Sequence, residues 1–152
     1  MKIKLCAFAD EASSQLYGQI DALKRNGIKY IELRSVNGQN VKDITIDQAK
    51  EYAKILNENR IKVYSIGSPI GKVDVSVDIE EYLKQVTHIF ELAKVFGTTK
   101  IRMFSFFNAY DKREKVIDNL NKMVKKAKEY CVGLYHENEK DIYGDTIERV
   151  LD

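Results

Sequence analysis

An alternation of strand-type and helix-type segments, repeated five times, constrains the fold of this chain more than any other feature. The apolar runs that predict strands cover residues 3–9, 28–33, 62–67, 100–106 and 132–137. Between these runs, apolar residues recur every three or four positions, which is the spacing of one helix face. The alternation predicts an α/β fold in one domain over residues 1–152, with parallel strands and right-handed helical crossovers.

The helical segments carry boundary signals of their own. Thr45 and Gln48 have the spacing of a capping box, and Asp78 with Glu81 fits the start of the longest helix. Cys131 stands where a glycine is expected to end the fourth helix. These signals support helices that begin and end between the predicted strands.

Two architectures satisfy such an alternation, a doubly wound sheet and a (β/α)8 barrel. The first strand-to-helix turn, FADEASS, has no GxGxxG pattern, and no Walker loop occurs, which disfavours the nucleotide-binding forms of the doubly wound sheet. Polar residues gather at the predicted strand ends, where barrel enzymes place their chemistry. They are Asp10, Glu11, Glu32, Arg34, Ser65, Ser68, Ser105 and Glu137. We expect an incomplete barrel of about five of the eight units, because a complete one takes roughly 250 residues.

Composition narrows the classes of partner. Lys and Arg number 25 against 23 Asp and Glu, and the two signs are interspersed, so nucleic-acid binding through bulk charge is not expected. No apolar run approaches the ~18 residues of a membrane span, and the N-terminus turns acidic too early for a signal peptide. We expect a cytoplasmic protein without a membrane partner. Cys6 and Cys131 have no CxxC spacing and are expected to be small apolar residues in or beside strands.

Three charged residues near strand ends are candidates for a site. Period-two alternation places Glu32 on one face with Tyr30, Arg102 with Phe104, and Glu137 with Tyr135. If these faces point into a barrel, Glu32, Arg102 and Glu137 line its mouth. The alternative is that Glu32 and Arg102 form an internal structural ion pair.

Glu137 alone is one carboxylate, and a divalent ion would need further Asp, Glu or His ligands beside it. His136 is adjacent but points to the opposite face of its strand, so we expect it in the helix-facing layer. His88 falls within a helix near its apolar stripe and is expected to be structural.

The segment from Ser68 to Lys72, SPIGK, leaves the end of the third strand. Its serine hydroxyl and lysine could hold a phosphate or a sugar hydroxyl, or the segment could be only a turn with a solvated lysine. Aromatic residues on the strands could add an apolar wall for a sugar ring, or simply belong to the core.

The chain is similar to a known group of proteins in five motifs and in their order and spacing. The motifs are FADEAS, YIELR, IGSPIGKV, IRMFSFF and YHENEKDIYGDT. It resembles the sugar phosphate isomerases and epimerases of the xylose isomerase-like TIM barrel superfamily, from residue 3 to 152. The resemblance implies a divalent metal, commonly manganese, magnesium or zinc, held by four side chains, of which Glu137 corresponds to one. The other three, an Asp, a His and a second Glu, come from later strands that this sequence does not contain.

The superfamily also contains endonuclease IV, and here the sequence departs from the pattern. The histidines that such nucleases place at the ends of early strands are absent, since Gly67, Ser68 and Ser105 stand there. This departure argues against a trinuclear zinc site and cleavage of abasic DNA.

The resemblance therefore implies an isomerase or epimerase of a sugar or sugar phosphate that works through a metal-bound enediolate. Glu137 would be a metal ligand and a catalytic base, and Glu32, Ser68, Lys72 and Arg102 would hold the substrate. One carboxylate gives weak, unspecific metal affinity, so we expect the metal site of this chain alone to be incomplete and not to hold a metal tightly. The alternative is a non-catalytic barrel fragment that acts as a binding or assembly module. The open sheet edges lead us to expect a homo-oligomer.

Overall fold

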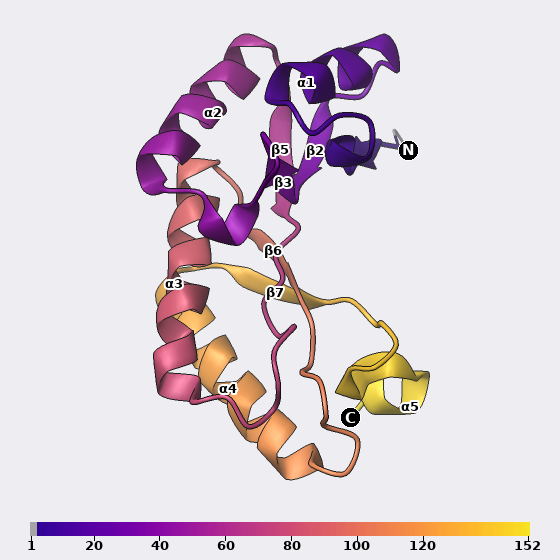
Figure 1. The fold of residues 1–152 in the computed structure, drawn as a ribbon, viewed down its shortest axis with the longest axis vertical. Coiled ribbons are helices and arrows are strands. Elements are labelled where there is room, and N and C mark those ends of the chain that lie inside the picture. The colour runs from indigo at the N-terminus through magenta and orange to yellow at the C-terminus, as the bar shows by residue number, and fades with distance from the viewer. Residues whose placement is uncertain (1–2) are drawn as a thin grey trace.

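The computed structural model describes residues 3–152, and its centre is a five-stranded parallel sheet (Figure 1). The strands are β1 (Cys6–Ala7), β2 (Tyr30–Leu33), β5 (Lys62–Ile66), β6 (Lys100–Met103) and β7 (Gly133–His136). They lie in the order β1-β2-β5-β6-β7, and each neighbouring pair is parallel.

This strand order decides between the two architectures. In a doubly wound sheet the strand order reverses at a switch point. Here each strand of the parallel sheet lies beside the sheet strand that comes before it in the sequence. Successive right-handed crossovers that always step in one direction put every helix on the same side and curve the sheet toward a barrel. The prediction of an incomplete (β/α)8 barrel with five parallel strands is confirmed.

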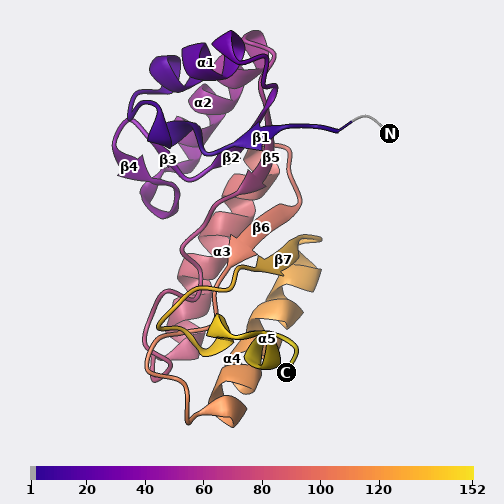
Figure 2. The same ribbon diagram turned by 90° about the vertical axis from the view of Figure 1, so that its right-hand side faces the viewer.

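Four longer helices and one short one follow the strands. They are α1 (Leu16–Arg25), α2 (Ile46–Glu58), α3 (Ile79–Val95), α4 (Arg113–Glu129) and the single turn α5 (Ile147–Val150). Figure 2 shows α1 and α2 at one end of the molecule and α3 and α4 toward the other. The expected capping box of Thr45 and Gln48 is present, and Asp78 accepts hydrogen bonds from the backbone N–H groups of Glu80 and Glu81.

The two faces of the sheet differ in composition. Side chains that point toward the helices are apolar and buried, among them Ile31, Leu33, Ile66 and Ile101. The alternate positions face the other way and carry aromatic and charged side chains. These are Tyr30, Glu32, Lys62, Tyr64, Lys100, Arg102, Tyr135 and Glu137. The face that would be the inside of a closed barrel is therefore polar and aromatic.

A small antiparallel hairpin after β2 was not expected. It consists of β3 (Ser35–Val36) and β4 (Gln39–Asn40), joined through Asn37 and Gly38, whose φ angles are 54° and 77°. Two consecutive positive φ angles are those of a type I′ turn, for which Asn-Gly is the preferred sequence. The hairpin forms a separate two-stranded sheet between β2 and α2, and the strands of the main sheet remain parallel.

The first strand is shorter and less buried than the sequence suggests. Only Cys6 and Ala7 pair with β2, and Ile3 and Leu5 are 81% and 63% exposed. The apolar run 3–9 predicted a longer strand, whereas β1 is a short edge strand with a neighbour on one side only. Cys6 lies in β1 and Cys131 lies just before β7, in or beside strands as expected, and both are exposed.

Cys131 does occupy the position expected of a glycine. Its φ angle is +56°, directly after the end of α4, where the left-handed conformation reverses the chain. A side chain costs about 1 kcal/mol in this conformation because Cβ approaches the following carbonyl oxygen.

We therefore expect Cys131→Gly to raise the free energy of unfolding by about 1 kcal/mol, measured by urea denaturation. Cys131→Ala removes the thiol but keeps Cβ, so it is the matched control and should leave stability nearly unchanged. Equal stabilisation by both substitutions would show that the thiol, not the backbone conformation, is responsible.

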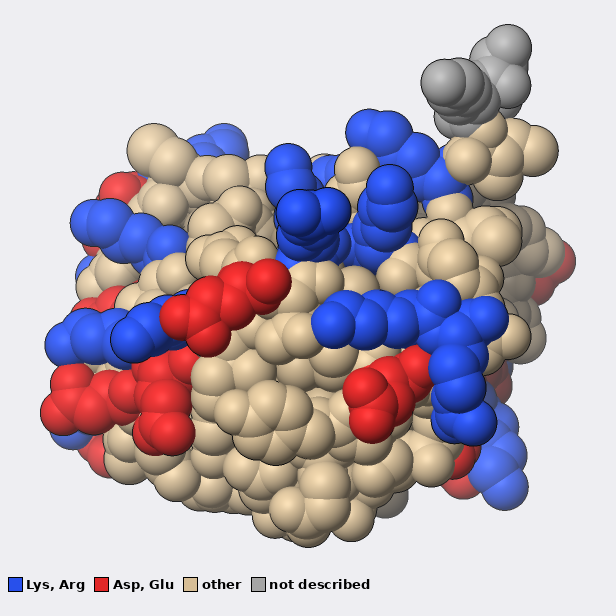
Figure 3. Space-filling model, turned by 90° about the horizontal axis from the view of Figure 1, so that it is seen from above, with Lys and Arg blue, Asp and Glu red and all other residues tan. Residues whose placement is uncertain are grey.

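The surface charge agrees with the near-neutral composition. Figure 3 shows one end of the molecule, where basic and acidic side chains lie beside one another among uncharged residues. Within residues 3–152, no helix combines the length and the hydropathy that crossing a membrane would require.

Candidate active site

Arg102 is the centre of a charged cluster at the carboxyl ends of the strands. Its Nη1 lies 3.1 Å from Glu137 Oε2 and 3.6 Å from Glu32 Oε1, and its Nη2 donates to the carbonyl oxygen of Gly67 at 3.2 Å. The guanidinium thus bridges Glu32 of β2, the residue directly after β7 and the segment that follows β5. The alternation of the sequence correctly placed Glu32, Arg102 and Glu137 on one face, and the structure brings their side chains together.

Two aromatic rings hold the guanidinium. Arg102 Cζ lies 5.3 Å from the ring centre of Phe8 and 5.2 Å from that of Phe104, both within the range of cation–π attraction. The Arg102 side chain is only 15% exposed, against 22% for Glu32 and 42% for Glu137. Glu137 is therefore the member of the cluster with most access to solvent and to a ligand.

A cavity of about 560 Å³ opens over this cluster. Its wall combines Glu32, Arg102 and Glu137 with the rings of Tyr64 and Tyr135, which are 43% and 55% exposed. A volume of this size suits a small-molecule ligand. The aromatic faces can contact the apolar side of a ring, while the charged groups can bind hydroxyl groups.

Ser65 fixes Glu32 within the cluster. Its hydroxyl donates a hydrogen bond of 2.8 Å to Glu32 Oε2, while the other carboxylate oxygen faces Arg102. Both oxygens of Glu32 are therefore engaged by protein groups. The alternative of an internal ion pair between Glu32 and Arg102 describes this geometry, and Glu137 extends it to a triad.

Ser68 does not reach the cavity. It is fully buried, its hydroxyl donates to the carbonyl oxygen of Arg102, and it accepts a hydrogen bond from the N–H of Ile70 at 3.2 Å. Through these hydrogen bonds Ser68 connects the loop after β5 to the end of β6. The expectation that Ser68 holds the substrate stays a prediction.

Lys72 lies in the same loop and points toward the loop after β7. Its Nζ bonds both carboxylate oxygens of Glu139, at 2.9 and 2.8 Å, and lies 4.3 Å from the ring centre of Phe104. About one third of each charged side chain is exposed. Lys72 thus contacts the same Phe104 ring as Arg102 and is paired, instead of being a solvated lysine in a turn.

A second ion pair lies at the ends of β1 and β2. Arg34 Nε donates to Asp10 Oδ2 at 2.7 Å, its Nη2 bonds Glu11, and these bonds raise the pKa of the Arg34 guanidinium above its usual value. Arg34 also lies 5.1 Å from the ring centre of Phe8, the ring that contacts Arg102. Phe8 therefore separates two guanidinium groups, each with its own carboxylates.

The histidines have structural environments, as expected. His136 faces the helix side, where its Nε2 lies 2.9 Å from the hydroxyl of Ser105, and burial lowers its pKa below the usual value. The same hydroxyl accepts a bond from the N–H of Gly144. His88 Nε2 lies 2.8 Å from the carbonyl oxygen of Ile44.

The described residues do not by themselves form a metal site. Within residues 3–152 no three His, Cys, Asp or Glu side chains lie close enough to share an ion. The space between Glu32 and Glu137 faces the guanidinium of Arg102, which already balances their charge. The donor set therefore does not fit a bound divalent metal on its own, although Glu137 is exposed enough to contribute one oxygen.

Sequence reasoning missed two residues that shape the site. Phe8 lies two residues after Cys6, so period-two alternation places both side chains on the same face of an extended chain. This spacing could have predicted that the Phe8 ring lies on the inner face of the sheet. Glu139 lies in a loop, 67 residues from its partner Lys72, and no local pattern links the two.

Comparisons with known proteins agree with this architecture. A family model described as "Xylose isomerase-like TIM barrel" matches residues 20–152, and no curated protein matches the chain. Among solved structures, the probable 3-DHS dehydratase AsbF from Bacillus anthracis has a TM-score of 0.74 and 18% identity, over 99% of this chain and 57% of that one. The IOLI protein, solved with a zinc atom, has a TM-score of 0.70 and 17% identity, over 97% and 56%.

A third structure, the 3-keto-D-glucoside 4-epimerase YcjR from E. coli, has a TM-score of 0.67 and 18% identity, over 98% of this chain and 61% of that one. At these identities the likeness shows the fold alone. The chain spans between half and two thirds of the length of these three proteins. Together with the family match over residues 20–152, the strand order shows that this chain belongs to the xylose isomerase-like TIM barrel family.

Proposed function

We propose that this chain supplies part of the active site of a sugar or sugar-phosphate isomerase or epimerase. The observation that carries the proposal is the triad of Glu32, Arg102 and Glu137 under an aromatic-walled cavity at the carboxyl ends of the strands. Barrel enzymes place their chemistry at this end. Among the proteins with similar folds, one is a 3-keto-D-glucoside 4-epimerase and another is described as similar to D-tagatose 3-epimerase.

Within the proposal, each residue has a distinct part. Glu137, the most exposed member of the triad, takes or returns a proton at the carbon beside the carbonyl group of the sugar. Arg102 and Glu32 orient Glu137 and bind hydroxyl groups. Lys72 contacts the substrate at the rim of the cavity, where its partner Glu139 can move away because it lies in a loop.

A divalent metal would polarise the carbonyl oxygen when bound. Two proteins of similar fold were solved with magnesium and with zinc. Among residues 3–152, Glu137 would contribute one ligand, and because no three candidate ligands lie together there, further ligands would come from elsewhere.

We also propose that the chain assembles with a second copy through its sheet edges. In the described part of the chain, β1 and β7 each pair on one side only, and apolar grooves of about 260 and 230 Å³ lie beside them. Unpaired strand edges recruit further strands. The polar inner face of the sheet favours contact at these edges over burial of that face.

Deuterium exchange tests the proposed function. The protein is first sized by light scattering, with an expected mass above that of one 17.5 kDa chain, and is then incubated in D₂O with Mn²⁺ and a panel of ketoses and ketose phosphates. We expect deuterium to replace the hydrogen on the carbon beside the carbonyl group. This exchange should need millimolar Mn²⁺, because few protein ligands are present to bind the metal. The exchange should be lost in Glu137→Gln.

Glu58→Gln, on the outer helix α2, is the matched control and should exchange normally. Exchange that survives in Glu137→Gln, or no exchange with any sugar at saturating Mn²⁺, would contradict the proposal. Tight one-to-one Mn²⁺ binding by the chain in calorimetry would show that the metal site is not incomplete.

A further inference from the structure

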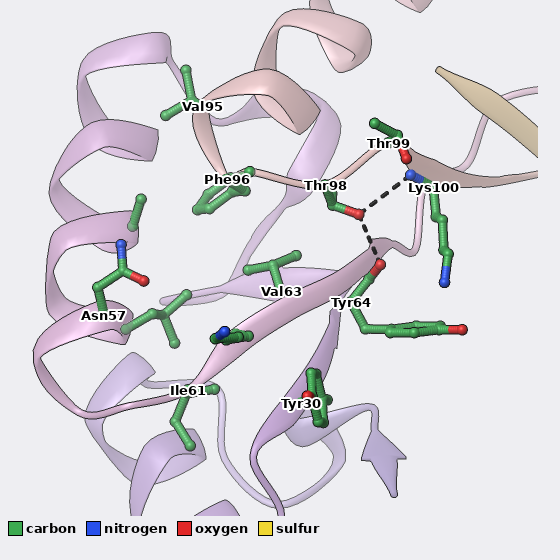
Figure 4. A pocket seen from close by; sticks show the side chains of 14 residues that line it. Tyr30, Asn57, Ile61, Val63, Tyr64, Val95, Phe96, Thr98, Thr99 and Lys100 are labelled. Atoms are coloured by element: carbon green, nitrogen blue, oxygen red, sulfur yellow. Dashed lines mark hydrogen bonds between the residues drawn. The ribbon is translucent and has the colours of Figure 1, made fainter. Parts of the chain in front are cut away.

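A second cavity, of about 470 Å³, lies at the opposite ends of the strands from the candidate active site. It is bounded by the starts of β5 and β6 and by the last turns of α2 and α3 (Figure 4). In barrel enzymes this end usually serves stability instead of catalysis. Tyr64 and Lys100 line both cavities, whereas Glu32, Arg102 and Glu137 line only the first.

The charged groups of this cavity are all positive. Among the described residues that line it, Lys62 and Lys100 are basic and none is acidic. Within residues 3–152, neither lysine makes an ion pair or donates a side-chain hydrogen bond, whereas Lys72, Lys84 and Lys126 each have a carboxylate partner. Two lysines in one cavity without a counter-ion leave uncompensated positive charge, which an anion would balance.

Aromatic rings position one of these lysines. Lys100 Nζ lies 3.6 Å from the ring centre of Tyr64, and Tyr64 packs edge-on against Tyr30, with ring centres 6.2 Å apart. Figure 4 shows the side chain of Lys100 extending beside Tyr64, with Tyr30 next to it. The ring contact orders the ammonium group but satisfies none of its three N–H donors by an oxygen atom.

Lys62 and Lys100 do not serve to neutralise the C-terminal ends of the nearby helices α2 and α3. Cations often neutralise the last carbonyl groups of a helix. Here those carbonyls are already bonded within the backbone, since Gly97 and Thr98 donate to Lys94 and Ala93 after α3, and Arg60 and Ile61 close α2 in the same way. The Nζ atoms of Lys62 and Lys100 make no hydrogen bond to them in the described structure.

Polar donors complete the cavity. Thr98 bonds the carbonyl oxygen of Tyr64 through its hydroxyl, at 2.7 Å, and accepts a bond from the N–H of Lys100, which fixes the start of β6 beside β5. Thr99 and Asn57 also line the space. We propose that this cavity binds a small molecule bearing a phosphate or carboxylate group, with Lys62 and Lys100 on the anion and Tyr64 against the adjoining carbon skeleton.

Titrations followed by ¹H–¹⁵N NMR test the proposal, with glucose 6-phosphate, gluconate and glucose as probes. We expect saturable shifts of the Thr98 and Thr99 amides, which line only this cavity, with either or both of the charged probes, and none with glucose. A response to glucose 6-phosphate alone identifies phosphate as the anion, and a response to gluconate shows that a carboxylate suffices. Lys62→Met and Lys100→Met should each weaken binding roughly tenfold, the effect of one charge-assisted hydrogen bond.

Lys94→Met is the matched control, because Lys94 lies in the last turn of α3 but does not line the cavity. It should bind the charged probes like the unmodified protein. The amides of Glu32 and Glu137 report on the candidate active site, so the two sites are distinguished in one spectrum. Shifts confined to those amides, equal shifts with glucose, or full affinity in the Lys62→Met/Lys100→Met double variant would overturn the proposal.

Discussion

Arg102→Met is expected to lower the free energy of unfolding by about 3 kcal/mol, measured by urea denaturation. Removing one partner of a largely buried ion pair leaves an uncompensated charge, which costs about 3–5 kcal/mol when the burial is complete. Here Glu32 is 22% exposed and loses its counter-ion, while Glu137 is 42% exposed and is partly solvated. The partial exposure places the expected cost at the lower end of that range.

The methionine keeps the contact with the aromatic rings, so the loss reports mainly on charge. Its side chain can still lie between Phe8 and Phe104, which flank Arg102 in the protein. Adding Glu32→Gln and Glu137→Gln to Arg102→Met removes the uncompensated carboxylates and should restore part of the stability. A single variant within about 0.5 kcal/mol of the unmodified protein would show that the triad contributes little to the fold.

The framework of this triad was predictable from sequence because it depends on short-range periodicity. Strand alternation puts Glu32, Arg102 and Glu137 on one face, and a parallel sheet in chain order brings the ends of β2, β6 and β7 to the same edge. Neither step needs information about loops. The fold class and the cluster therefore followed from pattern alone.

Contacts made by loops did not follow from pattern. Ser68 looked like a ligand-binding hydroxyl, yet its neighbours in space, Arg102 and Ile70, bury it and use its bonding capacity. The pairing of Lys72 with Glu139 depends on how two loops approach each other across the end of the sheet. The hairpin turn at Asn37-Gly38 was a different case, because its local signal is present in the sequence and was passed over.

The unpaired lysines illustrate a third limit. A sequence shows that Lys62 and Lys100 lie on strands, but not that the carboxylates elsewhere in residues 3–152 leave both without a partner. Charge balance in a cavity is a property of the whole arrangement. Only the complete set of ion pairs identified these two lysines as available for a ligand.

Gly71→Ala is expected to destabilise the protein by about 3 kcal/mol or more. Gly71 has a φ angle of +86°, which costs an L-residue about 1–2 kcal/mol. In addition, a Cβ at this position would lie 2.0 Å from the carbonyl oxygen of Phe104, far inside any permitted contact. The backbone cannot yield easily, since Gly71 accepts a bond from the N–H of Phe106 and donates one to the hydroxyl of Tyr82.

Gly38→Ala separates the two contributions, because Gly38 also has a positive φ angle, +77°, but a Cβ there meets nothing within 4 Å. It should cost only about 1–2 kcal/mol in the same urea experiment. The difference between the two variants is then the cost of pushing the loop of residues 68–72 away from Phe104, and with it Lys72 from the Phe104 ring. Equal losses in Gly38→Ala and Gly71→Ala would mean that the loop moves aside freely, and that the close approach to Phe104 does not hold Lys72 in place.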